Sequence, residues 1–261
     1  MTLFDSIFLG LIQGVTEFFP ISSSGHLVLF QTFLGLEPAD HTFFNILVHA
    51  GTLLAILIYF REKLIHLAKG LIKKEKSSIS LFLNLIISTL PIVVVGLLFE
   101  DFITSFFSTT TSVALAMLAT ASFFLVGEYV SKHKDTAQLT SLKAFVIGLV
   151  QSIAIIPGVS RSGSTLIAGL LSGIDREEAA EYSFLIAIPA ISGAVVLSIL
   201  KVLTNPQSVS LNPTPLVAGF LTAFIAGYFS IKFLMHLYKK HSLNGFAVYL
   251  VLVFVSLMFF A

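Results

Sequence analysis

The chain has 261 residues, of which 56% are hydrophobic and only 11% are charged, and its mean hydropathy is +0.97. Soluble domains carry about 25% charged residues, so this composition excludes an ordinary soluble protein. The formal net charge of +1 provides no basic surface for nucleic acid, and a sequence without cysteine excludes disulfides and thiolate metal sites. Repeated apolar runs of about 20 residues instead indicate membrane-spanning helices.

Eight apolar stretches follow one another along the chain. The first, residues 3–35, is too long for one span and too short for two spans with a turn, and residues 142–172 have the same property. We expect both to be re-entrant helical hairpins, because PISSSGH at 20–26 and PGVSRSGST at 157–165 break them in the middle. The other six have the length of single spans and cover about 43–60, 81–99, 113–130, 182–203, 215–237 and 245–261.

The two hairpins resemble each other at a shift of 138 residues. GLIQ at 10–13 matches GLVQ at 148–151, and SSSG at 22–25 matches SRSG at 160–163. Three spans, an odd number, follow each hairpin, so the second copy is inverted in the membrane. We therefore expect an all-α integral membrane protein with two inverted-topology repeats, each a re-entrant hairpin plus three transmembrane helices, around a central polar site. The expected organisation is a single membrane domain over 1–261, with repeat one over about 1–131 and repeat two over about 142–261.

The basic residues fall mostly on one side of this arrangement. Thirteen of the 15 lysines and arginines lie there, whereas Lys201 lies on the other side and Arg161 lies within the second hairpin. The positive-inside rule makes the basic side cytoplasmic, so both termini and the mouth of the first hairpin are expected to face outward. Residues 61–80 are expected to form a loop on this side. Its basic run from Lys69 to Lys76 is interpreted as a solvated segment that sets the orientation, the alternative being a ligand-binding patch.

Gln13 and Glu17 are four residues apart, which places both on one face of the first half-helix. A carboxylate beside an amide oxygen suits a hard divalent cation, Mg²⁺ or Ca²⁺. Water and the substrate phosphate would supply the other ligands of this cation. The alternative is that Glu17 serves only as the ion-pair partner of Arg161. A charge at membrane depth costs about 2.5–3.5 kcal/mol, so Glu17 needs a positive partner. The partner is the cation in the first interpretation and Arg161 in the second.

The serines at 22–24 precede Gly25 and His26 at the start of the next half-helix. Hydroxyls and N–H groups at the positive end of a helix dipole bind anions readily. If this helix begins at Ser23, His26 follows one turn later, within reach of the Ser23 proton. The alternative is a serine helix cap with a histidine satisfied by a carbonyl group.

Arg161 is the only arginine at membrane depth, and small and hydroxyl residues surround it. Its planar fork of donors matches phosphate oxygens. Its neighbours are expected to form a neutral cradle around the same anion. Other polar residues on apolar helices are interpreted as interhelical hydrogen-bond partners, namely Asn45, His49, Asn84, Glu128 and Tyr182.

The motifs QGVTE at 13–17, PISSSGH at 20–26 and PGVSRSGST at 157–165 resemble those of the bacterial undecaprenyl-diphosphatase family, also called the bacitracin-resistance family. The resemblance covers essentially the full length. It implies a multi-pass enzyme of the bacterial inner (plasma) membrane that requires a divalent cation. Its substrate would be undecaprenyl diphosphate, cleaved to undecaprenyl phosphate and inorganic phosphate. This reaction would recycle the lipid carrier of peptidoglycan synthesis and confer bacitracin resistance.

The expected site follows from the residues and the resemblance together. Catalytic roles are expected for Glu17, Ser23, His26 and Arg161, and cation binding for Gln13 and Glu17. Binding of the substrate phosphate is expected for Ser22, Ser24, Gly25, Gly158, Ser160, Ser162, Gly163 and Thr165. Attack by Ser23, with a phosphoserine intermediate, and attack by water with His26 as base both stay open. Assembly as a homodimer is also left open. The alternative function is that of a transporter or flippase for polyprenyl phosphate without hydrolysis.

Overall fold

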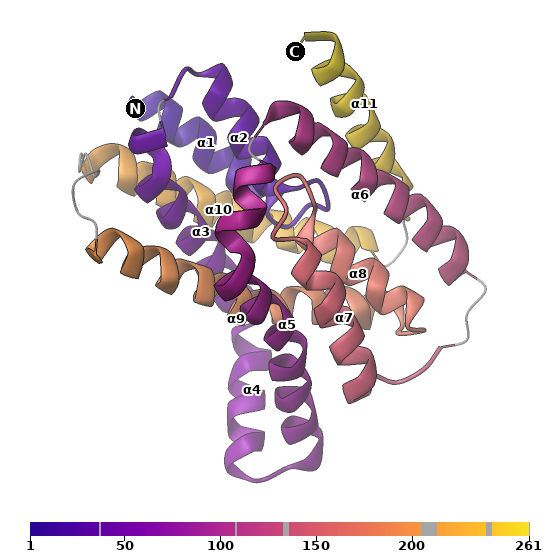
Figure 1. The fold of residues 1–261 in the computed structure, drawn as a ribbon. Coiled ribbons are helices and arrows are strands. Elements are labelled where there is room, and N and C mark those ends of the chain that lie inside the picture. The colour runs from indigo at the N-terminus through magenta and orange to yellow at the C-terminus, as the bar shows by residue number, and fades with distance from the viewer. Residues whose placement is uncertain (37, 108, 133–135, 205–212, 239–241, 261) are drawn as a thin grey trace.

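A computed structural model of the chain describes every residue except 37, 108, 133–135, 205–212, 239–241 and 261 (Figure 1). This part of the chain forms helices and no strand. The helices are α1 (Leu3–Thr16), α2 (Ser23–Phe33), α3 (Pro38–Tyr59), α4 (Arg61–Ile72), α5 (Lys76–Phe106), α6 (Thr110–Ser131), α7 (Ser141–Ile153), α8 (Arg161–Leu171), α9 (Arg176–Thr204), α10 (Pro213–Tyr238) and α11 (Asn244–Phe260).

Four of these helices, α5, α6, α9 and α10, are long and apolar enough to cross a membrane. A fifth candidate is the pair of α3 and α4, which meet this criterion only together and are bent by 70° at their junction. The expected sixth span corresponds to α11, whose 17 residues fall short of the roughly 20 that an upright span requires. The prediction of an all-helical, multi-pass membrane protein is confirmed, with four or five candidate spans among the described residues where six single spans were expected.

Both interrupted stretches form two short helices instead of one span. Residues 17–22 separate α1 from α2, and residues 154–160 separate α7 from α8. The first helix of each pair packs closely on a long helix, α1 on α10 and α7 on α5. Glycine permits this approach, since a Cβ on Gly10 would lie 2.6 Å from a backbone oxygen of α10, and one on Gly148 would lie 2.5 Å from a backbone oxygen of α5.

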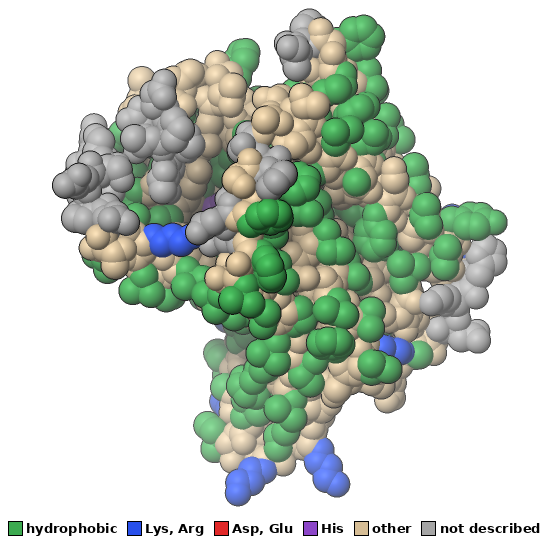
Figure 2. Space-filling model, viewed as in Figure 1, with side chains coloured by type: hydrophobic (Ala, Val, Ile, Leu, Met, Phe, Trp, Pro, Cys, Tyr) green, Lys and Arg blue, Asp and Glu red, His purple; other side chains and the backbone are tan. Residues whose placement is uncertain are grey.

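The interpretation of residues 61–80 as a loop is wrong. Most of this segment is helical, because α4 ends at Ile72 and α5 begins at Lys76. Leu67 and Gly70 of α4 are buried, and α4 packs on α5, so the apolar positions of this charged segment do recur with helical spacing. The resulting α4–α5 hairpin projects from the body of the molecule, with Lys and Arg side chains at its tip and apolar side chains along its sides (Figures 1 and 2).

The polar residues of the second break are held inside the helical body. Residues 162–170 of α8 are all buried, and α6, α7 and α9 pack around this helix. The first break is held similarly, because α2 packs on both α1 and α6. The starts of α2 and α8 therefore lie largely inside the protein, with Ser23, Ser24 and Arg161 partly exposed, and protein partners satisfy many of their polar groups.

Candidate active site

Glu17 is the centre of a buried hydrogen-bond cluster, with a side chain that is only 5% exposed. The guanidinium of Arg161 donates to Oε1 at 2.7 Å, while Ser23 Oγ and Gln13 Nε2 donate to Oε2 at 2.5 and 2.9 Å. Arg161 also donates from Nη1 to the carbonyl oxygen of Ala187 on α9 at 3.3 Å. The cluster therefore joins two hairpins that are far apart in the sequence.

Helix ends place each member of this cluster. Glu17 caps the C-terminus of α1, donating its N–H to the carbonyl oxygen of Gln13 at 2.9 Å. Ser23 is the first residue of α2, and Arg161 is the first residue of α8. Two helix N-termini thus meet at one buried carboxylate, and the partial positive charge of both favours negative groups at this point.

The two helix starts have the same cap. The hydroxyls of Ser22 and Ser160 accept hydrogen bonds from the N–H groups of Gly25 and Gly163, each at 3.3 Å. Each cap hydroxyl also lies 3.4 Å from the hydroxyl two residues later. Neither glycine has room for a Cβ, because Met117 and Phe124 of α6 pack directly on them. These glycines therefore allow the half-helices to pack closely on α6 while their N–H groups stabilise the caps.

Two further residues of the second break support its backbone. The hydroxyl of Thr165 donates to the carbonyl oxygen of Arg161 at 2.9 Å and lies 2.6 Å from the Ser183 hydroxyl. Gly158 has a φ of +98° and lies so close to the backbone of α6 that no Cβ would fit. Both contacts hold the segment that carries Arg161 in place.

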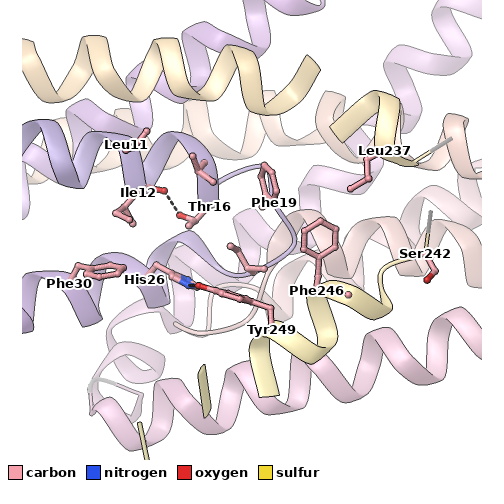
Figure 3. A pocket seen from close by; sticks show the side chains of 13 residues that line it. Leu11, Ile12, Thr16, Phe19, His26, Phe30, Leu237, Ser242, Phe246 and Tyr249 are labelled. Carbon is pink, nitrogen blue, oxygen red and sulfur yellow. Dashed lines mark hydrogen bonds between the residues drawn. The ribbon is translucent and has the colours of Figure 1, made fainter. Parts of the chain in front are cut away.

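His26 is buried and uses both ring nitrogens. Nδ1 lies 2.8 Å from the carbonyl oxygen of Ser22, and Nε2 lies 2.8 Å from the hydroxyl of Tyr249 on α11, with the two rings stacked (Figure 3). A carbonyl oxygen only accepts, so Nδ1 carries the proton and Nε2 accepts from Tyr249. Ser23 donates to Glu17, and the described hydrogen bonds do not join it to His26. Tyr249 had no recognisable signal in the sequence, where it is one aromatic residue of an apolar helix.

Comparison with known proteins shows the family. A family model described as "Bacitracin resistance protein BacA" matches residues 6–256. The chain belongs to the BacA family. Proteins named undecaprenyl-diphosphatase are similar to it over nearly their whole length: one from Halothermothrix orenii is 38% identical over 100% of this chain and 99% of its own. One from Methanococcus vannielii is 37% identical (98% and 99%), and one from Elusimicrobium minutum is 40% identical (95% and 94%).

Sequence reasoning missed His49 in this BacA family member. His49 Nε2 lies 3.9 Å from Glu17 Oε2, and the His49 side chain is 30% exposed, more than that of Glu17 or Arg161. Its Nδ1 lies 2.7 Å from the carbonyl oxygen of Asn45, one turn earlier on α3. His49 therefore lies beside the cluster, on its more accessible side, and an explanation by interhelical hydrogen bonds alone is incomplete.

The other isolated polar residues of this BacA family member do join helices. Glu128 of α6 accepts hydrogen bonds from Arg176 of α9 at 2.8 and 2.6 Å. Asn84 of α5 accepts one from Ser141 of α7 at 3.0 Å, and the hydroxyl of Tyr182 on α9 donates to the backbone of α5 at 2.8 Å. Asn45 of α3 likewise accepts a hydrogen bond from Gln31 of α2 at 2.6 Å, so the interpretation as interhelical partners is confirmed for these four residues.

The residues around Glu17 fit a hard divalent cation. Gln13 Oε1 is buried and has no hydrogen-bond partner within the described part of the chain, although the same amide donates to Glu17. Turned toward the carboxylate in place of the amide nitrogen, this oxygen would form with it a donor pair that suits Mg²⁺ or Ca²⁺. No group of three or more His, Asp or Glu residues that could hold a metal occurs among the residues described. Water and phosphate oxygens would have to supply the remaining ligands.

Proposed function

We propose that the chain hydrolyses undecaprenyl diphosphate to undecaprenyl phosphate and inorganic phosphate. The observation that carries this function is membership of the BacA family, with relatives named undecaprenyl-diphosphatase over the full length of the chain. A buried carboxylate, arginine and serine at membrane depth provide the chemistry that such a substrate needs. The reaction recycles the carrier of peptidoglycan synthesis and accounts for bacitracin resistance. Transport without hydrolysis is not favoured.

The geometry supports Ser23 as the nucleophile. Its oxygen would form a bond to the terminal phosphorus, while the bond from that phosphorus to the bridging oxygen of undecaprenyl phosphate breaks. The serine proton would pass to Glu17 Oε2, to which Ser23 already donates at 2.5 Å, and then to the departing phosphate. Water would then replace Ser23 on phosphorus, releasing inorganic phosphate and restoring the hydroxyl. We assign activation of this water to His26: the water would replace the Tyr249 hydroxyl on Nε2 and give Nε2 a proton, which would then pass to the departing Ser23 oxygen.

Arg161 and the two half-helix starts would bind the terminal phosphate. The guanidinium neutralises charge as the phosphorus–oxygen bond breaks, which is the main source of catalysis in phosphoryl transfer. Backbone N–H and hydroxyl groups of the two breaks would bind the remaining oxygens. The residues assigned to this role are Ser22, Ser24, Gly25, Gly158, Ser160, Ser162, Gly163 and Thr165.

Gln13 and Glu17 would hold a divalent cation, Mg²⁺ or Ca²⁺. When bound, this cation supplies positive charge that neutralises the diphosphate oxygens. The test of function and cofactor together is release of inorganic phosphate from farnesyl or undecaprenyl diphosphate by the detergent-purified protein. We expect release that a chelator abolishes and that Mg²⁺ or Ca²⁺ restores. A folded protein that releases no phosphate with any cation would refute the hydrolase.

Gln13→Ala should raise the cation concentration required for half-maximal phosphate release by about tenfold or more, because groups that orient a metal ligand typically contribute this much to affinity. The matched control is Gln151→Ala, which removes the corresponding buried amide of the second hairpin. Gln151 donates to the backbone of Ser88 at 3.1 Å and does not contact Glu17. An equal change in both variants would contradict a cation site at Gln13.

We also propose that the two halves are inverted repeats and that the site opens outward. Support comes from the matching serine caps, from the corresponding contacts of α1 with α10 and of α7 with α5, and from the matching caps of α1 and α7. Thr2 and Thr140 cap these helices and are themselves 138 residues apart. The basic side would be cytoplasmic and both termini external.

Single cysteines test this topology, because the chain has none of its own. We expect an impermeant maleimide to label Thr2→Cys in intact cells and to label Thr140→Cys only after permeabilisation. Labelling of both from the same side would contradict the inverted repeat, and the reverse pattern would contradict the orientation. Light scattering of the same detergent-solubilised samples tests whether the protein is a homodimer, which stays an expectation.

A further inference from the structure

A polar cavity of about 460 Å³ lies between α4, α5 and α9. Two helix faces form its walls, each with the i, i+3, i+4, i+7 spacing of one side of a helix. These faces consist of residues 77, 80, 81 and 84 of α5 and residues 178, 181, 182 and 185 of α9. Lys63 of α4 and residues 138 and 139 complete the described lining, which includes none of the residues assigned to hydrolysis.

The cavity lies at one end of two candidate membrane spans. These spans cover Lys76–Phe99 of α5 and Arg176–Thr204 of α9, and the cavity is lined by the first three turns of both. With 24 and 29 residues, the spans are about 36 and 44 Å long, which exceeds the hydrocarbon core of about 30 Å. Their first turns therefore extend into the headgroup layer, so a lipid headgroup is the occupant expected at this depth.

The charges that line the cavity are unbalanced. Glu181 forms an ion pair with Lys63. Glu178 lies one turn earlier on the same face of α9, is exposed, and takes part in none of the ion pairs among the described residues. Lys63 can neutralise only one of the two carboxylates, and the net negative lining favours an occupant with a positive group.

Asn84 adds an unused hydrogen-bond donor to this cavity. Only 2% of the residue is exposed, and its Oδ1 accepts a hydrogen bond from Ser141 at 3.0 Å. Its amide nitrogen takes part in none of the hydrogen bonds within the described part of the chain, although buried polar groups almost always have a partner. Because Asn84 lines the cavity, the occupant should carry an acceptor oxygen as well as a positive group.

We propose that this cavity binds the headgroup of a phospholipid with a primary ammonium, phosphatidylethanolamine. The ammonium would donate to Glu178 and Glu181. Phosphate oxygens would accept hydrogen bonds from Lys63 and from the amide nitrogen of Asn84. Phosphatidylcholine has no N–H group to donate, and phosphatidylglycerol has no positive charge, so each lacks one half of this match. The site does not depend on the proposed hydrolysis.

Native mass spectrometry of the detergent-purified protein tests this site. The protein is titrated with phosphatidylethanolamine, phosphatidylcholine and phosphatidylglycerol that carry the same acyl chains. We expect the wild type to bind phosphatidylethanolamine about tenfold more tightly than the other two, because a hydrogen bond to a charged group contributes about this much. Equal binding of the three lipids would overturn the proposal.

Glu178→Gln locates the binding in the cavity. It should remove most of the preference for phosphatidylethanolamine, because a neutral amide cannot balance the ammonium. Glu177→Gln is the matched control, since it removes the same charge from the same turn of α9 and Glu177 does not line the cavity. Both side chains are exposed, so neither substitution should unfold the protein. Loss of the preference in both variants, or in neither, would contradict this site.

Soluble O-phosphoethanolamine distinguishes a lipid from a free headgroup as the source. We expect it to bind at least about tenfold more weakly than the lipid, because it lacks the apolar carbons that would lie against Leu81 and Leu185. Equal affinity for the soluble compound and the lipid would overturn the assignment to a membrane lipid.

Discussion

Arg161→Ala should lower phosphate release by at least about a thousandfold, the magnitude typical of an arginine that stabilises phosphoryl transfer. Arg161 is the positive group bonded to Glu17, at 2.7 Å, and it begins the helix whose N-terminus faces the same point. Its loss removes the positive charge from the reacting phosphate and leaves a buried carboxylate without its ion-pair partner. The measurement is kcat for farnesyl diphosphate under saturating cation, together with the melting temperature of each purified variant.

The chain contains a matched control for this substitution. Arg176 forms a second ion pair, with Glu128 at 2.6 Å, whose carboxylate is also buried. Breaking either pair should cost about 3–5 kcal/mol of stability, because a buried charge is left uncompensated. Only Arg161→Ala should abolish turnover in the fraction that remains folded. Equal activity of folded Arg161→Ala and Arg176→Ala would show that Arg161 is purely structural.

The sequence predicted the parts of this structure that depend on local composition. Proline, glycine and hydroxyl residues end one helix and begin the next, so the breaks before Ser23 and Arg161 could be located. Hydropathy identified the long helices because lipid demands about 20 apolar residues. The α4 helix was missed, since the six lysines and arginines between residues 61 and 76 suggested a solvated loop, although the apolar residues of α4 have helical spacing.

Contacts between distant helices could not be read from the sequence. His49 and Tyr249 are single polar residues on apolar helices, and nothing nearby indicates that one lies beside Glu17 and the other bonds to His26. The neighbour of Ser23 was also not evident. Helical side chains tilt toward the N-terminus, so Ser23 at the start of α2 points out of the helix toward Glu17, while His26 points back toward Ser22. Spacing of three residues alone suggested a contact between Ser23 and His26.

Ser23→Ala should lower kcat by about a thousandfold or more, because loss of a nucleophile removes the covalent step and leaves only binding and charge stabilisation. Ser23 is the hydroxyl bonded to Glu17, at 2.5 Å, so the group that would attack and the group that would take its proton are already in contact. The measurement combines kcat with rapid acid quenching of the wild type, in which mass spectrometry should find phosphate on the peptide that contains Ser23.

Ser24→Ala is the matched control, since Ser24 belongs to the same turn and contacts the Ser22 hydroxyl at 3.4 Å rather than Glu17. It should change KM for the diphosphate by no more than about tenfold and leave kcat nearly unchanged, as expected for one neutral hydrogen bond. Appreciable turnover by Ser23→Ala, with no phosphoserine in the quenched wild type, would contradict covalent catalysis. Direct attack by water would then be the mechanism, and His26, whose Nε2 carries no proton, would be its base.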